Sequence, residues 1–321
     1  MADKKKLKFA IFGNTYQPSK SSSFTELLAF LHTHGHEACI DRPFYEFAMH
    51  EHGADMSFAG VFDGDDFSAD YAISMGGDGT FLTTATRVGT KNIPIIGVNT
   101  GRLGFLADVL PSEIDEALDA VIHGRYRIEN HTAIQIETDG EHIPQCCYAL
   151  NDIAVLKRAE ASMISIRTSI NGEYLVTYQA DGLIVSTPTG STAYSLSNGG
   201  PIIVPQTSTL CLTPVAPHSL SVRPIVISDD SRVTLYVESR SHNFLAAIDG
   251  RSVTLTEGTT ITISKAPFVT RIVKRPPLLL FAPRKDDVGR RLPQGVTHVS
   301  GKTLTKSKSQ TCESKLPPCL I

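Results

Sequence analysis

In the first third of the chain, apolar residues form short continuous runs that alternate with segments of helical periodicity. Three short runs of apolar and β-branched side chains predict strands, over residues 7–13, 71–75 and 93–99. A helix is predicted over residues 23–34, where the apolar side chains form one stripe and Gly35 follows. A second is predicted over residues 112–123, with Ser112 as its cap and Gly124 past its end. Strand alternating with helix predicts a parallel sheet covered on both faces, with its ligand site beyond the carboxyl ends of the strands.

From about Tyr126 the pattern changes to short β-branched runs separated by Gly, Asn or Asp. These predicted strands cover residues 128–138, 149–157, 164–170, 174–180, 183–186, 224–228, 233–237, 244–248, 252–255, 260–264 and 268–273. Asn171-Gly172, between two of the runs, is typical of a two-residue hairpin. The sequence therefore predicts an α/β domain with a doubly wound, Rossmann-like parallel sheet over residues 1–125 and a β-rich domain over residues 126–275.

Composition narrows the classes of function. The chain has 321 residues and a formal net charge of −3, so two cores can form and no broad basic surface favours nucleic acid or an anionic membrane. No apolar run approaches the roughly 20 residues that span a bilayer. The six cysteines lack paired CxxC spacing, and the histidines between residues 32 and 52 lack Cys or carboxylates at ligand spacing. We expect a cytoplasmic protein with reduced thiols, no nucleic-acid or membrane partner and no metal site of its own.

The strongest local motif is Gly76-Gly77-Asp78-Gly79-Thr80, between the strand of residues 71–75 and a helical run over residues 81–87. Glycines let backbone N–H groups approach a polyphosphate, and the following helix presents its positive end. A carboxylate would repel phosphate if it served binding alone, so we interpret Asp78 as a proton acceptor or a metal-side ligand. The alternative is a turn in which these residues only satisfy geometry.

Three further segments carry weaker signals. Arg102 lies between two glycines after the next strand, where it could clamp a phosphate or simply occupy a surface turn. Asn151-Asp152 opens a strand and suits adenine and ribose, although this pair is also common in turns. Residues 181–201 are rich in Gly, Ser and Thr and either wrap a nucleotide or form a flexible loop, and Tyr194 offers stacking or a hydroxyl there. Asp249-Gly250 is a hairpin turn by default.

Together these segments resemble the NAD kinase family in order and spacing, over roughly residues 7 to 275. The resemblance rests on residues 76–80, 99–105, 151–152, 181–201, 217–220 and 249–250. The Gly-Gly-Asp-Gly-Thr motif also occurs in lipid and phosphofructo kinases, whereas its combination with residues 189–194 is more specific to NAD kinases. The family commonly has Asn-Glu where this chain has Asn151-Asp152, which leaves the reach of Asp152 to a ribose hydroxyl open.

The resemblance implies transfer of the terminal phosphoryl group of ATP, or of polyphosphate, to the 2′-hydroxyl of the adenosine ribose of NAD. It also implies a divalent cation such as Mg²⁺ and a homo-oligomer, a dimer or tetramer. Asp78 is the implied base, and Asp249 would lie near the reactive ribose from the same or a neighbouring subunit. The implied nucleotide-binding positions are Gly76, Gly77, Gly79, Thr80, Arg102, Phe105, Asn151, Asp152, Asp181, Thr189, Ser191, Thr192, Ala193, Tyr194, Ala216 and Asp249.

Two alternatives remain at this point. A lipid kinase of the same superfamily would need an apolar groove and usually a membrane-binding device, and neither is evident in the sequence. A non-catalytic NAD-binding protein would be the natural interpretation if Asp78 were replaced, and it is present.

The C-terminal segment, residues 276–321, is expected to be a disordered or out-of-frame tail. It is polar and has no periodic apolar face. Similar NAD kinases commonly close with a segment that contains a tryptophan, and this chain has none. That closing segment contains Lys, Met, Met and Trp in succession. If the codons of Lys285 to Gly289 are read one nucleotide later, they can encode the same four residues in the same order. A natural disordered tail with a chance match is the alternative.

Overall fold

The computed structural model describes residues 6–15, 21–52, 56, 58–101, 104–143, 147–158 and 163–274. Within this part, no helix is both long and apolar enough to cross a membrane. The predicted C-terminal tail lies outside the described residues.

The N-terminal part contains a parallel sheet in the strand order β3-β2-β1-β4-β5. Its strands are β1 (Lys8–Gly13), β2 (Glu37–Asp41), β3 (Gly60–Phe62), β4 (Tyr71–Gly76) and β5 (Ile95–Asn99). Its helices are α1 (Ser21–Thr33), α2 (Arg42–His52), α3 (Asp78–Val88) and α4 (Ile114–Ile122).

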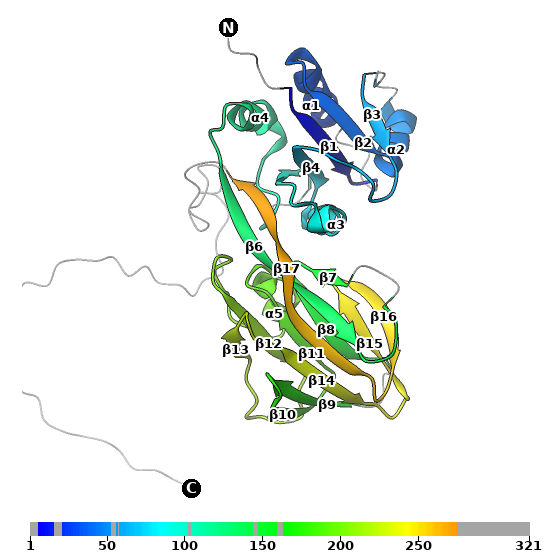
Figure 1. Cartoon of the computed structure of the whole chain (residues 1–321), viewed down its shortest axis with the longest axis vertical. Coiled ribbons are helices and arrows are strands. Elements are labelled where there is room, and N and C mark those ends of the chain that lie inside the picture. Colours follow the sequence, from blue (N-terminus) through cyan, green and yellow to red (C-terminus); the bar gives the residue numbers. More distant parts are fainter. Residues whose placement is uncertain are drawn as a thin grey trace, which may run out of the picture. The chain divides into compact units, whose positions relative to one another are not determined.

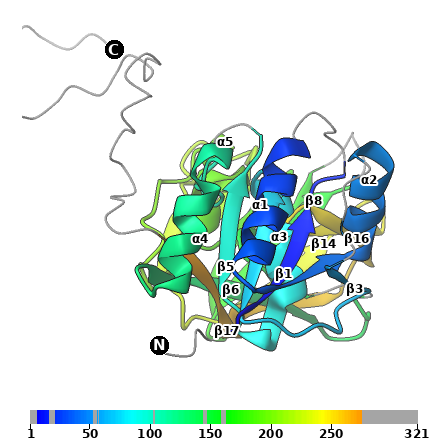
Figure 2. The same ribbon diagram turned by 90° about the horizontal axis from the view of Figure 1, so that it is seen from above.

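Both faces of the parallel sheet are covered, as the sequence predicts. Phe9 and Ile11 of β1 belong to the core that α1, α2 and α4 form, and α1 lies beside α4 (Figure 2). Ala10 and Phe12 point to the other face and pack with residues of α3. Successive side chains of a strand point to opposite faces, so a strand buried on both sides is continuously apolar.

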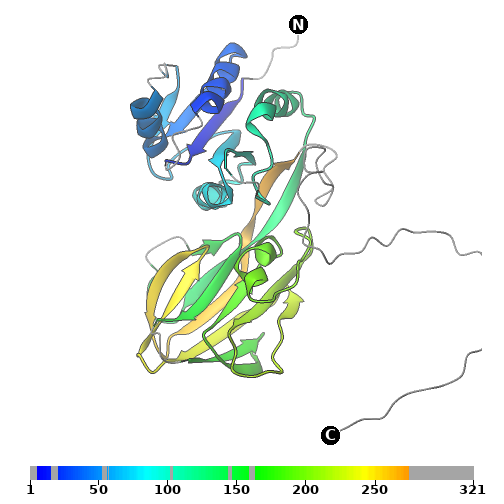
Figure 3. The same cartoon turned by 180° about the vertical axis from the view of Figure 1, so that it is seen from behind.

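The remaining strands are mostly antiparallel and form two layers. One layer is a six-stranded sheet in the order β13-β12-β11-β8-β15-β16, visible from behind in Figure 3. Its strands are β8 (Asp152–Lys157), β11 (Gly182–Ser186), β12 (Thr209–Val215), β13 (Ile225–Ser228), β15 (Asn243–Ile248) and β16 (Arg251–Thr256). The other layer contains β6 (Arg127–Thr138), β7 (Tyr148–Ala149), β9 (Ile164–Ile170), β10 (Glu173–Ala180), β14 (Val233–Glu238) and β17 (Thr260–Lys274). Inward-facing residues of both layers, such as Ile134, Leu183 and Phe244, form one buried core.

Two long strands connect the antiparallel layer to the parallel sheet. β6 and β17 pair antiparallel along almost their whole length, from Thr138 opposite Ile261 to Arg127 opposite Lys274 (Figure 1). β17 also pairs with β5, where Ile272 lies opposite Ile95. The parallel strands and the layer that contains β6 and β17 therefore form one continuous sheet, and the six-stranded layer is a second sheet.

The fold class is confirmed, with corrections at particular elements. The helix after the glycine motif begins at Asp78, so Gly79 and Thr80 lie in its first turn. The helix predicted over residues 112–123 begins at Ile114 after a 3₁₀ turn over Pro111–Glu113, so Ser112 is not its cap. The two strands predicted within residues 260–273 are one strand, β17, with a bulge between Lys265 and Val269.

Candidate functional site

The Asp78 carboxylate holds a second segment of the chain. Its Oδ2 accepts a hydrogen bond from the N–H of Phe105 at 2.9 Å. Its Oδ1 accepts from the N–H groups of Leu106 at 3.1 Å and Ala107 at 3.3 Å. A Cβ atom on Gly104 would lie 2.3 Å from Oδ1 of Asp78, so only glycine allows this approach. Asp78 is therefore fixed at the first turn of α3, with its carboxylate directed at residues 104–107.

The three glycines of the motif differ in what the fold requires of them. A Cβ atom on Gly76 would lie 2.1 Å from Oγ1 of Thr80, so the packing requires glycine there. A Cβ atom on Gly77 or Gly79 would meet nothing within 4 Å, and neither residue has a positive φ. Since glycine early in a helix weakens it, the fold itself gives no reason for Gly79, whereas close approach of a ligand would.

Asn99 ties the end of β5 to the same region. Its Oδ1 accepts a hydrogen bond from the N–H of Gly101 at 2.9 Å, and its Nδ2 donates to the carbonyl of Ala107 at 3.3 Å. The N–H of Thr100 donates to the carbonyl of Gly76 at 3.1 Å. The two predicted loops thus lie together at the carboxyl edge of the sheet. Phe105 is 60% exposed there, and Arg102 lies outside the described residues.

Asp249 plays a similar holding role for the Asn-Asp pair. Asp249 and Gly250 have φ values of 46° and 80° and form the predicted two-residue turn between β15 and β16. The Asp249 carboxylate accepts hydrogen bonds from the N–H groups of Leu150 at 2.8 Å, Asn151 at 2.8 Å and Asp152 at 3.1 Å. The short connection between β7 and β8 is therefore held by the side chain of a residue almost one hundred positions later in the sequence.

Asp152 is an unusual carboxyl group. It is only 7% exposed. Burial, followed by the negative charge of Asp249, raises the pKa of Asp152 to about 7. Burial also raises the pKa of Asp249, although its three amide donors act in the opposite direction. Two neighbouring carboxyl groups whose pKa values are both raised by burial are typical of functional sites.

The segment that follows β11 packs directly on the Asn-Asp pair. Oγ1 of Thr187 donates to the carbonyl of Leu150 at 2.6 Å, and the N–H of Thr187 donates to the carbonyl of Asn151 at 2.9 Å. A Cβ atom on Gly190 would lie 2.0 Å from the carbonyl oxygen of Asn151, so the backbones touch there. The structure thus brings together residues 150–152, 187–190 and 249.

The predicted nucleotide-binding residues of this segment differ in accessibility. Ser191 is fully buried, and its Oγ bonds to the chain at Pro188 and Ile203, so it holds the loop in shape. Thr189 is 7% exposed, whereas Tyr194, at the start of the four-residue helix α5 (Tyr194–Ser197), is 39% exposed. Thr192 and Ala193 are half-buried between them.

Asp181 and Ala216 lie at the other end of β11. The N–H of Asp181 donates to the carbonyl of Val215 at 2.9 Å, and its carboxylate pairs with Nζ of Lys157 at 2.8 Å. Because Asp181 precedes the five-residue strand and Thr189 follows it, the strand separates them by roughly 16 Å. The structure therefore divides the predicted NAD-binding residues into two groups.

Sequence reasoning missed a buried contact to the predicted site. Nδ1 of His131 lies 2.8 Å from Oγ1 of Thr189, and Nε2 of His131 lies 3.4 Å from Oε2 of Glu129. The available signal was the spacing of Glu129 and His131 at alternate positions of one predicted strand, which places both on one face.

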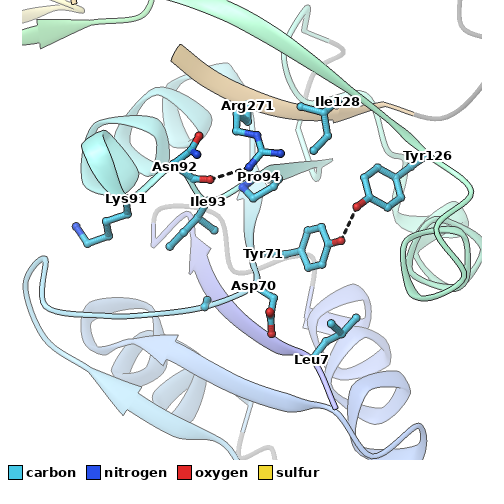
Figure 4. A pocket seen from close by; sticks show the side chains of 11 residues that line it. Leu7, Asp70, Tyr71, Lys91, Asn92, Ile93, Pro94, Tyr126, Ile128 and Arg271 are labelled. Atoms are coloured by element: carbon cyan, nitrogen blue, oxygen red, sulfur yellow. Dashed lines mark hydrogen bonds between the residues drawn. The ribbon is translucent and has the colours of Figure 1, made fainter. Parts of the chain in front are cut away.

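A separate pocket of about 300 Å³ lies at the amino ends of the parallel strands (Figure 4). Its lining includes Tyr71, whose hydroxyl lies 2.6 Å from that of Tyr126, and Arg271, which donates to the carbonyl of Asn92. Tyr71 begins β4 and Asp78 follows its end, so this pocket lies away from the Asp78 region. No predicted site residue lines it.

The part of the chain that the structure describes contains no group of three or more His, Cys, Asp or Glu side chains placed to hold a metal ion. Asp78, the carboxylate within the glycine motif, already accepts three backbone hydrogen bonds. This donor set does not fit a cation held in an all-protein cage.

Comparison with known families accounts for this arrangement. Residues 9–126 match the model of the ATP-NAD kinase N-terminal domain, and residues 150–275 match that of the ATP-NAD kinase C-terminal domain. The chain belongs to the NAD kinase family.

Individual relatives agree with this assignment. The chain is 57% identical to an NAD kinase of Bacteroides fragilis over 269 residues, which cover 84% of this chain and 93% of the relative. It is 43% identical to an NAD kinase of Porphyromonas gingivalis over 270 residues, with the same coverage. Membership of the family makes the chain a kinase rather than a non-catalytic protein. It also favours an NAD kinase over the lipid kinase that the sequence left open.

Solved structures share the fold. A yeast NADH kinase complexed with NADH matches with a TM-score of 0.76 and 24% identity, covering 84% of each chain. An NAD kinase from Archaeoglobus fulgidus in complex with ATP matches with a TM-score of 0.66 and 26% identity, covering 84% of this chain and 94% of the other.

Proposed function

We propose that this protein transfers the terminal phosphoryl group of ATP to the 2′-hydroxyl of the adenosine ribose of NAD, giving NADP. The observation that carries the proposal is the match of both halves of the chain to ATP-NAD kinase domains. The geometry supports it, because Asp78 and the open glycines lie together at the carboxyl edge of the sheet, where ligands of such folds bind.

On the ATP side, the backbone N–H groups at Gly77 and Gly79 and the positive end of α3 would bind phosphate oxygens. Asp78 would accept the proton of the attacking 2′-hydroxyl. Phosphoryl transfer depends mainly on positioning and charge stabilisation, so the three amides that fix the Asp78 carboxylate suit this role. The exposed Phe105 borders the same region and would contact a bound nucleotide.

On the NAD side, Asn151 would pair with the adenine edge and Asp152 would accept bonds from ribose hydroxyls. Thr189, Thr192, Ala193 and Tyr194 would line the same pocket. The contacts of Thr187 and Gly190 with residues 150–151 support this grouping, because they fix the two segments against each other.

A divalent cation, Mg²⁺, is proposed to enter with the phosphates of ATP. Mg²⁺ usually keeps several waters and binds through phosphates and one or two carboxylates. The Asp78 carboxylate, the only one in the glycine motif, would lie beside a cation held mainly by the phosphates of ATP. When bound, the cation neutralises charge on the transferred phosphoryl group.

The protein is proposed to act as a homo-oligomer with shared sites. Asp181 and Ala216 lie at the opposite end of β11 from Thr189, so a second copy could supply them to the NAD pocket. We expect that Asp78→Asn and Asp181→Ala proteins, each weakly active, regain activity when their subunits are exchanged. Activity equal to the average of the two separate proteins would reject shared sites, and the mass in solution gives the oligomer size.

The test of the reaction is incubation of purified protein with NAD, ATP and Mg²⁺, followed by separation of the products. Formation of NADP, measured with an NADP-specific dehydrogenase, is the expected result. Parallel reactions with NADH and with polyphosphate define the acceptor and donor. No NADP under any of these conditions would overturn the proposal.

A further inference from the structure

A row of buried ionisable side chains lies across β6 and β17. Glu129 is 6% exposed, His131 is 3% exposed and Lys274 is 7% exposed. Glu129 lies opposite Ile272 in the paired strands, so Lys274, two residues further along β17, is its diagonal neighbour on the same face. Burying such groups is unfavourable unless they are paired, so their partners are informative.

On one side, the row contacts the segment proposed to bind NAD. Nδ1 of His131 lies 2.8 Å from Oγ1 of Thr189, while its Nε2 lies 3.4 Å from Oε2 of Glu129. Arg127 pairs with the other oxygen of Glu129 at 2.7 Å. The hydrogen bond with His131, and then the charges of Lys274 and Arg127, lower the pKa of Glu129, so this carboxylate is a charged acceptor at neutral pH.

On the other side, the row contacts the segment that holds the proposed base. Nζ of Lys274 lies 3.0 Å from Oδ2 of Asp108 and donates to the carbonyl of Leu106 at 3.3 Å. The N–H of the same Leu106 donates to Oδ1 of Asp78. A charge on β17 therefore fixes the peptide units that in turn fix Asp78.

We propose that His131 and Lys274 are positioning residues for phosphoryl transfer, with Glu129 as the carboxylate that contacts His131 and lies diagonal to Lys274. His131 would hold Thr189 and its segment in the geometry that binds NAD. Lys274 would hold residues 106–108 in the geometry that directs Asp78. The inference rests on the proposed function, and it assigns roles to residues outside the nucleotide-binding motifs.

The His131 role is tested with two nearly isosteric replacements. His131→Leu removes the polar contact with Thr189, and His131→Asn keeps a polar atom near the position of Nδ1. We expect His131→Leu to raise the KM for NAD about tenfold, the value of one hydrogen bond, with kcat and the KM for ATP little changed. His131→Asn should recover most of this loss. Ile134→Val, a buried change on the same strand, serves as the control and should leave the KM for NAD unchanged.

A double-mutant cycle identifies the partner of His131. Thr189→Val should raise the KM for NAD by a similar factor, and the double variant with His131→Leu should be no worse than the poorer single variant. Independent, multiplying effects would overturn the assignment of His131 to Thr189.

The Lys274 role is tested with a matched pair of substitutions on one strand. Lys265 also pairs with a buried carboxylate, that of Asp229 at 2.7 Å. We expect Lys274→Met to lower kcat about tenfold or more, with the KM for NAD unchanged, because small misplacements of a reacting group are costly. Lys265→Met should leave kcat at the wild-type value. Hydrogen exchange at the amides of residues 105–107 should accelerate in Lys274→Met and not in Lys265→Met.

The split between the two variants decides the proposal. If both His131→Leu and Lys274→Met change kcat and the KM for NAD equally, and in proportion to the thermal stability that they lose, the three buried residues only stabilise the fold. That outcome would overturn the proposal. If wild-type protein forms no NADP, the proposed function fails by itself. The exchange measurement then still decides whether Lys274 fixes the segment that binds Asp78.

Discussion

At the scale of single residues, Asp78 and Asp249 use one device. Each carboxylate lies at the start of a helix or in a turn and accepts three backbone N–H groups from a segment distant in sequence. A carboxylate offers about four acceptor positions, so one side chain can fix a short stretch of backbone that has no regular hydrogen-bond partner. For Asp249 this holding role is visible directly, while a place near the reactive ribose stays a prediction.

The role of Asp78 as base leads to a first prediction. Asp78→Asn removes the proton acceptor, and a positioned base contributes about 10²–10⁴-fold, so turnover should fall by that factor with little change in NAD affinity. Turnover is measured by NADP formation and affinity by calorimetry. Asparagine also places an N–H₂ group against the backbone N–H groups of residues 105–107, where two donors would face each other. The thermal stability of the variant is therefore measured as well, so that a loss of folding is not mistaken for a loss of catalysis. Near-normal turnover would reject Asp78 as the base.

The ribose contact proposed for Asp152 gives a second prediction. Asp152→Ala should weaken NAD binding by roughly 1.5–3 kcal/mol, the range for a hydrogen bond to a charged group, and spare ATP binding. Both affinities are measured by calorimetry above pH 7, where the carboxylate is ionised. An equal loss for both nucleotides would indicate a purely structural role.

The raised pKa of Asp152 gives a third prediction. Its folded pKa, about 7, exceeds the usual carboxyl value of about 3.9, so between these pH values the folded protein holds a proton that the unfolded chain has released. Stability should therefore fall as pH rises through this window, by up to about 1.4 kcal/mol per pH unit. Asp152→Asn cannot ionise and should escape this decline.

The measurement compares the unfolding free energies of wild-type and Asp152→Asn protein between pH 5 and 8. The unfolding free energy of Asp152→Asn protein minus that of wild type should increase up to about pH 7 and then stay constant. Asp66→Asn, at an exposed position, is the control. A difference independent of pH would contradict the buried, protonated state of Asp152.

At the scale of elements, prediction succeeds where a periodic pattern and its end signals agree. The parallel strands β1, β4 and β5 are buried on both faces and stand out as apolar runs. The hairpin at Asn171-Gly172 requires two positive φ values, 52° and 88°, which its sequence favours. Such local rules need no knowledge of the partner strands.

The missed elements lack one of these signals. The strand β2 has charged residues at both ends, and Phe44 and Ala48 are the buried residues among the described side chains of α2. Their apolar positions are therefore too few to predict an element from the sequence alone. The strand β12 contains Pro214, which is unusual inside a sheet. These elements depend on their neighbours in the sheet rather than on their own sequence.

The first turn of α3 supports a fourth prediction. A methyl group at residue 79 would meet no protein atom within 4 Å, and alanine stabilises a helix by roughly 0.5–1 kcal/mol relative to glycine. Gly79→Ala should therefore raise thermal stability and still weaken ATP binding, because the methyl group would occupy space needed by a phosphate. Gly140→Ala, also in open space, is the control. Unchanged ATP affinity would exclude close phosphate approach at Gly79.

At the scale of the whole molecule, sequence order predicts which segments matter but not how they connect. The glycine motif, the Asn-Asp pair and residues 187–190 could be identified one by one from their residue types. Their connection through His131, Glu129 and Lys274 depends on the pairing of β6 with β17, whose residues are more than one hundred positions apart. No local pattern encodes that register, because it follows from how the two layers pack around their core.

The end of the chain gives the last prediction. Similarity to the family ends at residue 275, and the predicted out-of-frame tail, residues 276–321, begins directly after it. If this tail is a product of a shifted reading frame, it has had no selection to pack or bind. A protein that ends at Arg275 should then keep the thermal stability and the kinase activity of the full chain. Resequencing the gene should reveal a second frame that encodes a tryptophan-containing closing segment. An intact single frame, together with loss of stability on removing residues 276–321, would show that the tail is a genuine part of the protein.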